Sequence, residues 1–216
     1  MISIERPDRW FKTASRARLQ LKRARQWVAN SDGELVLIRT REELANIVRR
    51  RNAGEAVIGI MLGLEGAHAL RDGINVAWLA DNGFRVLGLA HFNDNRFADS
   101  GHGWRRRGLS AAGRELCKQL EAQAITIDLS HASEAAIDDV FAMHAAGELS
   151  RPLIVSHTGV RGAHDHQRNI LDRQAIGVAQ GCGLIGVSFF KPALARADVD
   201  AIVETVNYVI ALLDDA

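Results

Sequence analysis

Short apolar runs alternate with longer, helix-compatible segments along most of the chain. Four of these runs cover residues 57–64, 84–90, 124–130 and 153–156, and they are rich in leucine and β-branched residues. Runs of this length and composition predict strands that are buried on both faces. Since strands and helices alternate, the pattern predicts a parallel α/β sheet or barrel.

The segments between the runs carry helix signals. Thr40 followed by Glu43 is a capping box, which predicts a helix that turns Leu44, Ile47 and Val48 toward the core. The polar stretch 92–108, rich in Gly and Arg, predicts a long loop of the kind that often has a function. Further helices are expected near residues 7–29, 73–82, 110–122, 134–146, 173–180 and 198–213, and further strands at residues 35–38 and 183–190.

The N-terminal segment is basic and poor in acids between residues 6 and 25, which is also how a transit peptide looks. Its apolar residues, however, alternate steps of four and three, which predicts a helix with one face packed on a core. These residues are Trp10, Ala14, Ala17, Leu21, Ala24 and Val28. We therefore prefer the packed helix, with its Arg and Lys in solvent.

Composition limits the possible classes of protein. The 216 residues are enough for one α/β domain, so we expect a single domain over residues 1–216. A net charge of +1 gives no reason to expect binding to nucleic acid or to a membrane, and we see neither a secretory signal nor a membrane span. Cys117 and Cys182 both stand among apolar residues and form no disulfide framework, so we expect a reducing, cytoplasmic location.

Each of the four apolar runs ends on a carboxylate or an imidazole: Glu65, His91, His131 or His157. In parallel α/β folds the C-terminal ends of the strands gather at the functional site. Glutamate and histidine together form a metal-ligand set. We therefore expect Glu65, His131 and His157 to bind a metal ion. Alternatively, Glu65 turns out to solvent and the histidines are structural.

Other polar residues leave two readings open. His91 could be a fourth ligand or could polarise a substrate carbonyl. Asp128 could orient a ligand or could face outward as a helix cap. Arg168, followed by Asn169, could capture a carboxylate with its guanidinium or could be a solvated loop residue.

Three further histidines are weaker candidates. His68 lies three residues after Glu65, and we expect it to pack against the loop. His164 and His166 form a His-x-His pair, but their setting is a loop with glycine, so we favour no metal role for them.

Five stretches in order resemble the membrane (renal-type) dipeptidase family of zinc dipeptidases, whose fold is a TIM-like barrel. They are Gly63-Leu-Glu-Gly-Ala-His68, Leu89-Ala-His91 with Ala98-Asp99, Gly108-Leu-Ser110 with Gly113, Ile127-Asp-Leu-Ser-His-Ala-Ser133, and Ile154-Val-Ser-His157 with Arg168-Asn169. The resemblance covers residues 27–190.

The resemblance implies a role for each candidate. Glu65 is similar to the carboxylate that bridges two zinc ions in the family, and His131 and His157 are similar to the histidine ligands of one of those ions. His91 resembles the residue that contacts the substrate carbonyl and the tetrahedral intermediate. Arg168, with Asn169, resembles the anchor for the C-terminal carboxylate of the substrate.

Two family features are absent from this sequence. The family carries a His-x-Asp pair on its first strand, and no histidine precedes His68 here; the family's Gly-x-Asp-Phe-Asp-Gly-like motif on the last strand is also absent. We therefore expect a partial TIM-like (β/α) barrel without its first and last strands, with one zinc site kept and the second lost. Open sheet edges predict a homo-oligomer or a covering partner.

The resemblance therefore implies a zinc-dependent hydrolase of dipeptides, which activates water for peptide-bond hydrolysis. One alternative is a catalytically impaired or inactive relative. Another is a one-metal amidohydrolase that acts on an N-acyl or lactone substrate.

Overall fold

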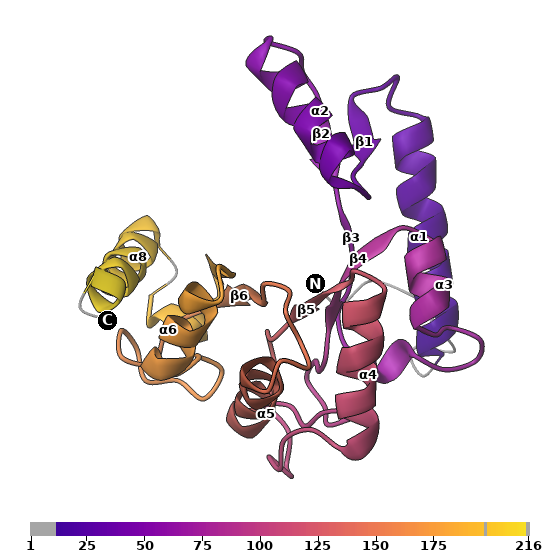
Figure 1. Ribbon diagram of the computed structural model, residues 1–216. Helices are drawn as coiled ribbons and strands as arrows, with labels where there is room; N and C mark the ends of the chain where they lie inside the picture. The colour runs from indigo at the N-terminus through magenta and orange to yellow at the C-terminus, as the bar shows by residue number, and fades with distance from the viewer. Residues whose placement is uncertain (1–11, 197, 215–216) are drawn as a thin grey trace. The chain divides into compact units, whose positions relative to one another are not determined.

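The computed structural model describes residues 12–196 and 198–214 (Figure 1). The described residues form two compact units. The first contains the chain up to residue 64 together with residues 68–86, and the second contains residues 65–67 and the chain from residue 87 onward. Pro7 and Trp10, which we assigned to the first helix, lie outside the described residues.

The first unit contains a two-stranded parallel sheet and three α-helices. Its elements are α1 (Thr13–Ala29), β1 (Leu35–Leu37), α2 (Arg41–Asn52), β2 (Ile58–Ile60), β3 (Leu62–Leu64), α3 (Val76–Asp81) and the start of β4 (Phe84–Gly88). Strands β1 and β2 pair in parallel, with Leu35 opposite Ile58, while β3 is the hydrogen-bonded neighbour of β4. Helix α1 buries Ala14, Ala17 and Leu21, so the predicted apolar face of this helix is confirmed for these residues.

Two expectations for the first unit are wrong. Residues 57–64 do not form one strand but two, β2 and β3, which belong to different sheets and are separated at the exposed Met61. On α2 only Ile47 is buried, whereas Leu44 and Val48 are each 48% exposed. The small sheet of three-residue strands has too little apolar surface to cover a wider stripe of that helix.

The capping box of α2 is confirmed. Thr40 Oγ1 accepts the backbone N–H of Glu43 at 3.1 Å, and the Glu43 carboxylate accepts the backbone N–H of Thr40 at 3.1 Å. The Arg39 guanidinium and the backbone N–H groups of Arg39 and Thr40 hold the pKa of Glu43 below its usual range. The helix therefore begins at the residue that the sequence indicates.

The second unit is a parallel α/β layer that begins at the end of β4. Its elements are α4 (Ala111–Ala122), β5 (Thr126–Asp128), α5 (Glu134–Ala145), β6 (Ile154–Thr158), α6 (Asp172–Gln180), β7 (Leu184–Val187), α7 (Lys191–Leu194) and α8 (Val199–Asp214); a short 3₁₀ turn covers Ala67–Ala69. The strand order is β4-β5-β6-β7, and β5/β6 and β6/β7 pair in parallel. The predicted alternation of strand and helix is confirmed here.

Helices α4, α5 and α6 pack on these strands and bury a continuous apolar core. Its fully buried members include Leu87, Leu89, Leu116, Cys117, Leu120, Leu129, Val140, Met143 and Val155. Burial raises the pKa of the Cys117 thiol to about 12. Cys182, by contrast, is exposed in the turn between α6 and β7, so its expected apolar setting is wrong; the glycines on either side provide no cover.

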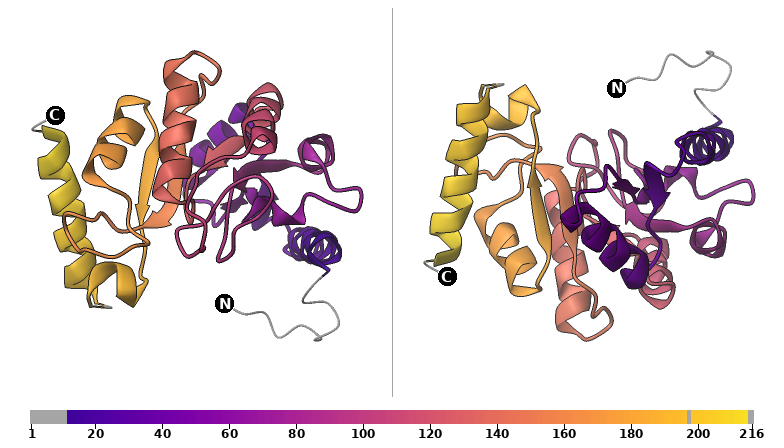
Figure 2. Two further views of the ribbon diagram at one scale, coloured as in Figure 1. Left: turned by 90° about the horizontal axis from the view of Figure 1, so that it is seen from below. Right: turned by 90° about the horizontal axis from the view of Figure 1, so that it is seen from above.

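The C-terminal part of the second unit leaves apolar side chains in solvent. Strand β7 ends at Val187, and Phe189, which we placed in the strand, is 70% exposed. Helix α8 contacts α6 and β7 (Figure 2), while Val199, Val203, Val206 and Ile210 stay exposed on it. Coverage by a second copy or another partner stays a prediction. Among the described residues, no helix combines the length and apolar character that crossing a bilayer requires.

Gly113 provides a test of the packing of α4. A Cβ built at this helical glycine would collide with the carbonyl oxygen of Phe97, which also accepts the backbone N–H of Ser110 at 2.9 Å. Glycine-to-alanine changes usually stabilise a helix interior, but Gly113→Ala should destabilise the protein by about 1–3 kcal/mol. Chemical denaturation measures the change.

Gly177→Ala in α6 is the matched control. There the three atoms nearest to the new Cβ all belong to the movable ring of Phe141, the first at 3.1 Å, so a smaller effect is expected. Equal stability of the Gly113→Ala variant and the unchanged protein would contradict the close approach of Phe97 to α4.

Candidate metal centre and its surroundings

The three expected ligands all belong to the second unit. Glu65 is followed by Gly66 and Ala67, whose backbone N–H groups donate to the carbonyls of Gly88 and Leu89 at the end of β4. His131 follows β5 in a left-handed backbone conformation, with φ of 63°. His157 lies within β6, one residue before its end. Neighbouring parallel strands thus bring the three side chains to one sheet edge.

The reactive atoms of these residues face one another. Oε1 of Glu65 lies 3.0 Å from Nε2 of His131 and 3.3 Å from Nε2 of His157, and the two Nε2 atoms are 2.9 Å apart. Two imidazole nitrogens and a carboxylate are a donor set that zinc accepts in catalytic sites. Three electron-rich atoms this close repel one another unless protons or a cation lie between them. The residues therefore fit a metal ion.

The electrostatics give Glu65 and His131 the charge state of metal ligands. The imidazoles of His131 and His157 hold the pKa of Glu65 well below its usual range, against the effect of partial burial. Burial lowers the pKa of His131 to about 4, even though Glu65 opposes this shift. An ionised glutamate and a neutral histidine are the forms that bind metals.

The hydrogen bonds of Asp128 decide whether it orients a ligand or faces outward as a helix cap. Its carboxylate accepts the backbone N–H groups of Ser130 and Ser156, each at 3.0 Å, and the hydroxyl of Ser156 at 2.5 Å. Ser156 Oγ in turn lies 2.8 Å from Nδ1 of His157. Asp128 is therefore connected to a ligand candidate and does not cap a helix.

His91 lies beside the three donors but farther away. Its Nε2 is 3.6 Å from Oε1 of Glu65, and its ring centroid is 4.7 Å from that of His131. The ring is half-buried, and this burial is the main cause that lowers its pKa. The position is compatible with either reading of His91, as a fourth ligand or as a contact to substrate.

Arg168 is buried, with 7% of its surface exposed, so the reading as a solvated loop residue is wrong. Its Nη2 donates to the carbonyl of His157 at 2.9 Å. Burial lowers the pKa of Arg168 to about 10, while Asp128 and Glu65 oppose that shift. A cationic side chain is thus held next to the candidate ligands.

Asn169, which we expected to bind substrate together with Arg168, is also buried. Its amide donates to the carbonyls of His164 and Ala193, both at 2.8 Å, and its Oδ1 accepts the backbone N–H of Gly159 at 3.1 Å. These bonds fix the loop that carries Arg168. A direct contact between Asn169 and substrate stays a prediction.

The weaker histidine candidates do not join the cluster of donors. His68 is exposed in the first unit. Nδ1 of His166 accepts the backbone N–H of Arg168 at 3.2 Å, and the carbonyl of His164 accepts from Asn169. In the described ranges, the acidic, histidine and cysteine side chains grouped closely enough to hold a metal are Glu65, His131 and His157.

Sequence reasoning missed two aromatic residues beside the cluster. Phe92 lies 4.3 Å from His91 and 5.4 Å from His131 between ring centroids, and His102 lies 5.8 Å from His131. Burial is the main cause that lowers the pKa of His102. Both residues lie in the stretch that we treated as one long loop, and only its length pointed to a function.

That loop, residues 92–108, is held by two carboxylates. Asp94 accepts the backbone N–H groups of Ser100, Trp104 and Arg105 at 2.8–3.1 Å. The buried Asp99 accepts the backbone N–H of Arg107 at 2.7 Å and pairs with the Arg105 guanidinium at 2.9 Å. Although the loop carries no regular element, these two carboxylates bind four of its backbone N–H groups and so define its path.

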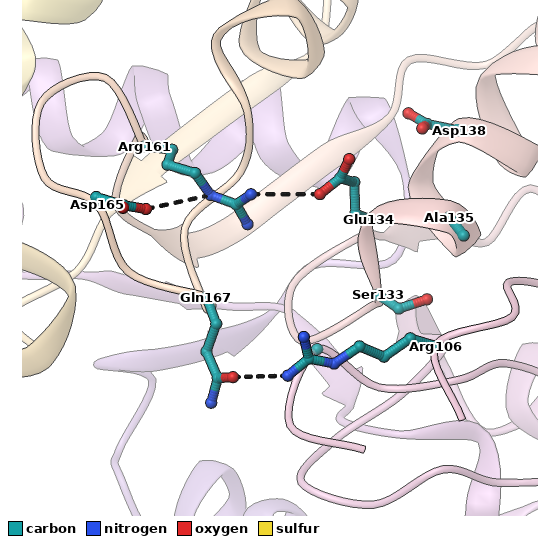
Figure 3. A pocket seen from close by; sticks show the side chains of 9 residues that line it. Arg106, Ser133, Glu134, Ala135, Asp138, Arg161, Asp165 and Gln167 are labelled. Carbon is teal, nitrogen blue, oxygen red and sulfur yellow. Dashed lines mark hydrogen bonds and ion pairs between the residues drawn. The ribbon is translucent and has the colours of Figure 1, made fainter. Parts of the chain in front are cut away.

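A pocket of about 430 Å³, lined mainly by charged and polar residues, lies where the loops after β5 and β6 meet the loop after β4 (Figure 3). Arg106 donates to Gln167 at 2.7 Å across it, and Arg161 pairs with Glu134 at 3.3 Å and with Asp165 at 4.0 Å. Gly101, Ser133, Ala135 and Asp138 complete the lining. None of the three metal-ligand candidates lines this pocket, and no pattern in the sequence predicted it.

Comparison with known proteins decides the family. A sequence profile described as membrane dipeptidase (peptidase family M19) matches residues 5–213. The chain belongs to this family. An uncharacterized dipeptidase of Schizosaccharomyces pombe is 32% identical over 160 residues, which are 70% of this chain and 38% of that protein. Dipeptidase tcpJ of Claviceps purpurea is 32% identical over 150 residues, covering 68% of this chain and 34% of that protein.

A protein encoded in the pqqA 5′ region of Klebsiella pneumoniae is 30% identical over 210 residues, covering 91% of this chain and 74% of that protein. Two solved structures share the fold. An amidohydrolase from Pseudomonas aeruginosa superposes with a TM-score of 0.77 at 23% identity, over 92% of this chain and 59% of the other. A metallopeptidase from Rhodobacter sphaeroides, bound to a phosphinate mimic of L-Ala-D-Ala, gives 0.72 at 23% identity, over 92% and 56%. The expected α/β fold of the dipeptidase type is confirmed.

The carboxylate of Asp94 can be tested as the organiser of the loop. Asp94→Ala leaves three backbone N–H groups without their acceptor, and such a loss typically costs about 1–3 kcal/mol. We expect trypsin to cut native Asp94→Ala after Arg105, Arg106 or Arg107 about 10-fold faster than the unchanged protein. Asp165→Ala, which removes a 92% exposed carboxylate, is the control. Equal cleavage of all three proteins would show that Asp94 does not order the loop.

Proposed function

We propose that this chain is a zinc-dependent hydrolase of dipeptides. The observation that carries the proposal is the convergence of Glu65, His131 and His157 on one point in a member of the membrane dipeptidase family. The dipeptide mimic bound to the Rhodobacter metallopeptidase supports this class of substrate. The curated relatives named dipeptidase support the same reaction.

The metal would be held by Oε1 of Glu65 and the Nε2 atoms of His131 and His157, because these are the atoms that face one another. A zinc ion at such a site supplies a Lewis acid and lowers the pKa of a water molecule enough to make it a nucleophile at neutral pH. We propose one zinc per chain, since the described residues bring together a single cluster of this kind.

Two cationic or donor side chains would bind the substrate. His91 stands next to the donors, where an imidazole N–H could stabilise negative charge that develops on the peptide carbonyl oxygen. Arg168 would bind the free C-terminal carboxylate. Its guanidinium has five N–H donors, and its bond to the carbonyl of His157 uses one of them. A carboxylate requirement would explain a preference for short peptides.

The second candidate is a metal-binding relative with impaired catalysis. It is favoured by the single cluster of donors among the described residues, whereas the resemblance to the dipeptidases implies two zinc ions. Losing a metal or an acid–base group typically costs about 10²–10⁴-fold in rate. For this reason we expect weak turnover even if the proposed reaction is right.

Metal content tests the first step of the proposal. The purified protein should contain about one zinc per chain, and the double variant His131→Ala/His157→Ala should contain none, because two of three ligands are removed. Elemental analysis measures the content. His144→Ala, which changes a histidine on α5 outside the cluster, should keep its metal. Unchanged zinc in the double variant would contradict the proposed centre.

Hydrolysis of simple dipeptides tests the reaction. We expect slow, chelator-sensitive turnover that fails with C-terminally amidated substrate. His91→Ala should lower kcat by about 10²-fold, and Arg168→Met should lower kcat/KM by about 10–100-fold. Turnover that survives chelation would show that the chemistry is different. Fast turnover that requires metal would contradict only the second candidate, a metal-binding relative with impaired catalysis.

A further inference from the structure

We propose that Asp128 and Ser156 fix the tautomer of His157, so that its Nε2 lone pair points at the metal centre. Asp128 and Ser156 are then positioning residues, because they would act on the metal only through His157. This inference rests on the proposed function. It explains how Nε2 of His157 is kept unprotonated, and therefore able to bind a metal ion, in the metal-free protein.

The carboxylate of Asp128 ties strand β5 to strand β6. Asp128 is 6% exposed at the end of β5, opposite Ile154 of β6 in the parallel register. Its Oδ1 accepts two backbone N–H groups, from Ser130 and Ser156, and its Oδ2 receives the Ser156 hydroxyl. The carboxylate therefore cannot rotate without breaking several bonds, and Oδ2 stays directed at Ser156.

The direction of each proton in this network follows from the donor inventory. A carboxylate only accepts, so the single hydroxyl proton of Ser156 points to Asp128. Ser156 Oγ can then only accept from its other neighbours, which are Nδ1 of His157 at 2.8 Å and Ser130 Oγ at 3.1 Å. Ser130 Oγ itself accepts the backbone N–H of His157 at 3.1 Å, which leaves its own proton for Ser156. Every polar atom of the network is satisfied in this one arrangement.

The consequence for His157 is a protonated Nδ1. A neutral imidazole carries one proton, so its Nε2 must then present a lone pair. That Nε2 is the atom that lies 3.3 Å from Glu65 and 2.9 Å from Nε2 of His131. The hydrogen-bond chain thus prepares the correct atom for a cation.

His131 has no equivalent arrangement. Its Nδ1 is buried and makes no hydrogen bond with the described residues. When Nε2 of His131 serves as a ligand, Nδ1 carries the proton, and the described residues provide no acceptor for it. Of the two histidines, only His157 therefore has its tautomer fixed by hydrogen bonds to the described residues. The metal affinity should depend on Asp128 and Ser156, which make this network.

Two substitutions separate the steps of the argument. Ser156→Ala removes only the connecting hydroxyl and releases His157 Nδ1. Asp128→Asn keeps the shape, but the amide oxygen is needed by the two backbone N–H groups, which places the amide nitrogen at Ser156. The Ser156 hydroxyl would then accept from the new amide at position 128 and donate to Nδ1 of His157. This reversal favours the tautomer with the proton on Nε2, which leaves that atom no lone pair for the metal.

We expect Ser156→Ala to weaken zinc binding by about 10- to 100-fold in a chelator competition, and Asp128→Asn to weaken it at least as much. Ser156→Thr keeps the hydroxyl and should bind zinc with the affinity of the unchanged protein. Asp139→Asn is the matched control, since that carboxylate lies on helix α5 and accepts the backbone N–H of Leu109 and the Arg114 guanidinium. In the metal-free protein, ¹⁵N shifts should report a protonated Nδ1 for His157 that is lost in Ser156→Ala.

An unchanged tautomer and affinity in Ser156→Ala would overturn the inference while the metal centre itself stands. If the unchanged protein binds no zinc, the proposed function is wrong, and the ¹⁵N shifts of His157 still decide the inference alone. If Asp128→Asn does not fold, Ser156→Ala decides the outcome, because it leaves the two backbone bonds of Asp128 in place.

Discussion

The parallel pairing of β5 with β6 is the constraint on which the candidate centre depends. It sets Asp128 opposite Ile154, and from this register His131 and His157 emerge at the same sheet edge. A slip of one residue would turn every side chain of one strand to the other face of the sheet. The Asp128 carboxylate, which accepts backbone N–H groups from both sides of the pair, makes such a slip costly. One buried carboxylate thus serves both the register and the site.

Much of the second unit could be predicted from the sequence, because its strands are continuous apolar runs and its helices have clear caps. Helices α4 and α5 lie within one residue of the ranges 110–122 and 134–146 that the sequence predicts, and the side chains of Ser110 and Ser133 cap them. The grouping of Glu65, His131 and His157 followed from one rule, that strand ends in parallel sheets converge. The rule requires no knowledge of side-chain packing, and this explains why it succeeded.

The wrong predictions of burial and strand bounds have a common physical origin. They depend on which parts of the fold pack against a residue, and the local sequence pattern does not contain this information. Leu44 and Val48 have helical spacing but no layer large enough to cover them. Residues 57–64 look like one strand because Met61, where the chain leaves one sheet for another, is as apolar as its neighbours. The burial of Arg168 and the network behind His157 were equally hidden, because they depend on contacts between segments far apart in sequence.

The backbone at His131 has a further consequence. A left-handed conformation costs a side chain with a Cβ about 1–2 kcal/mol, and glycine escapes this cost. The turn is held by backbone bonds from Ala132 to Leu129, from Gly101 to His131 and from Ser133 to Asp99. Selection for folding alone would therefore favour glycine at position 131, whereas the proposed metal ligation requires an imidazole there. Under the proposed function, the metal centre therefore lowers the folding stability of the protein at this residue.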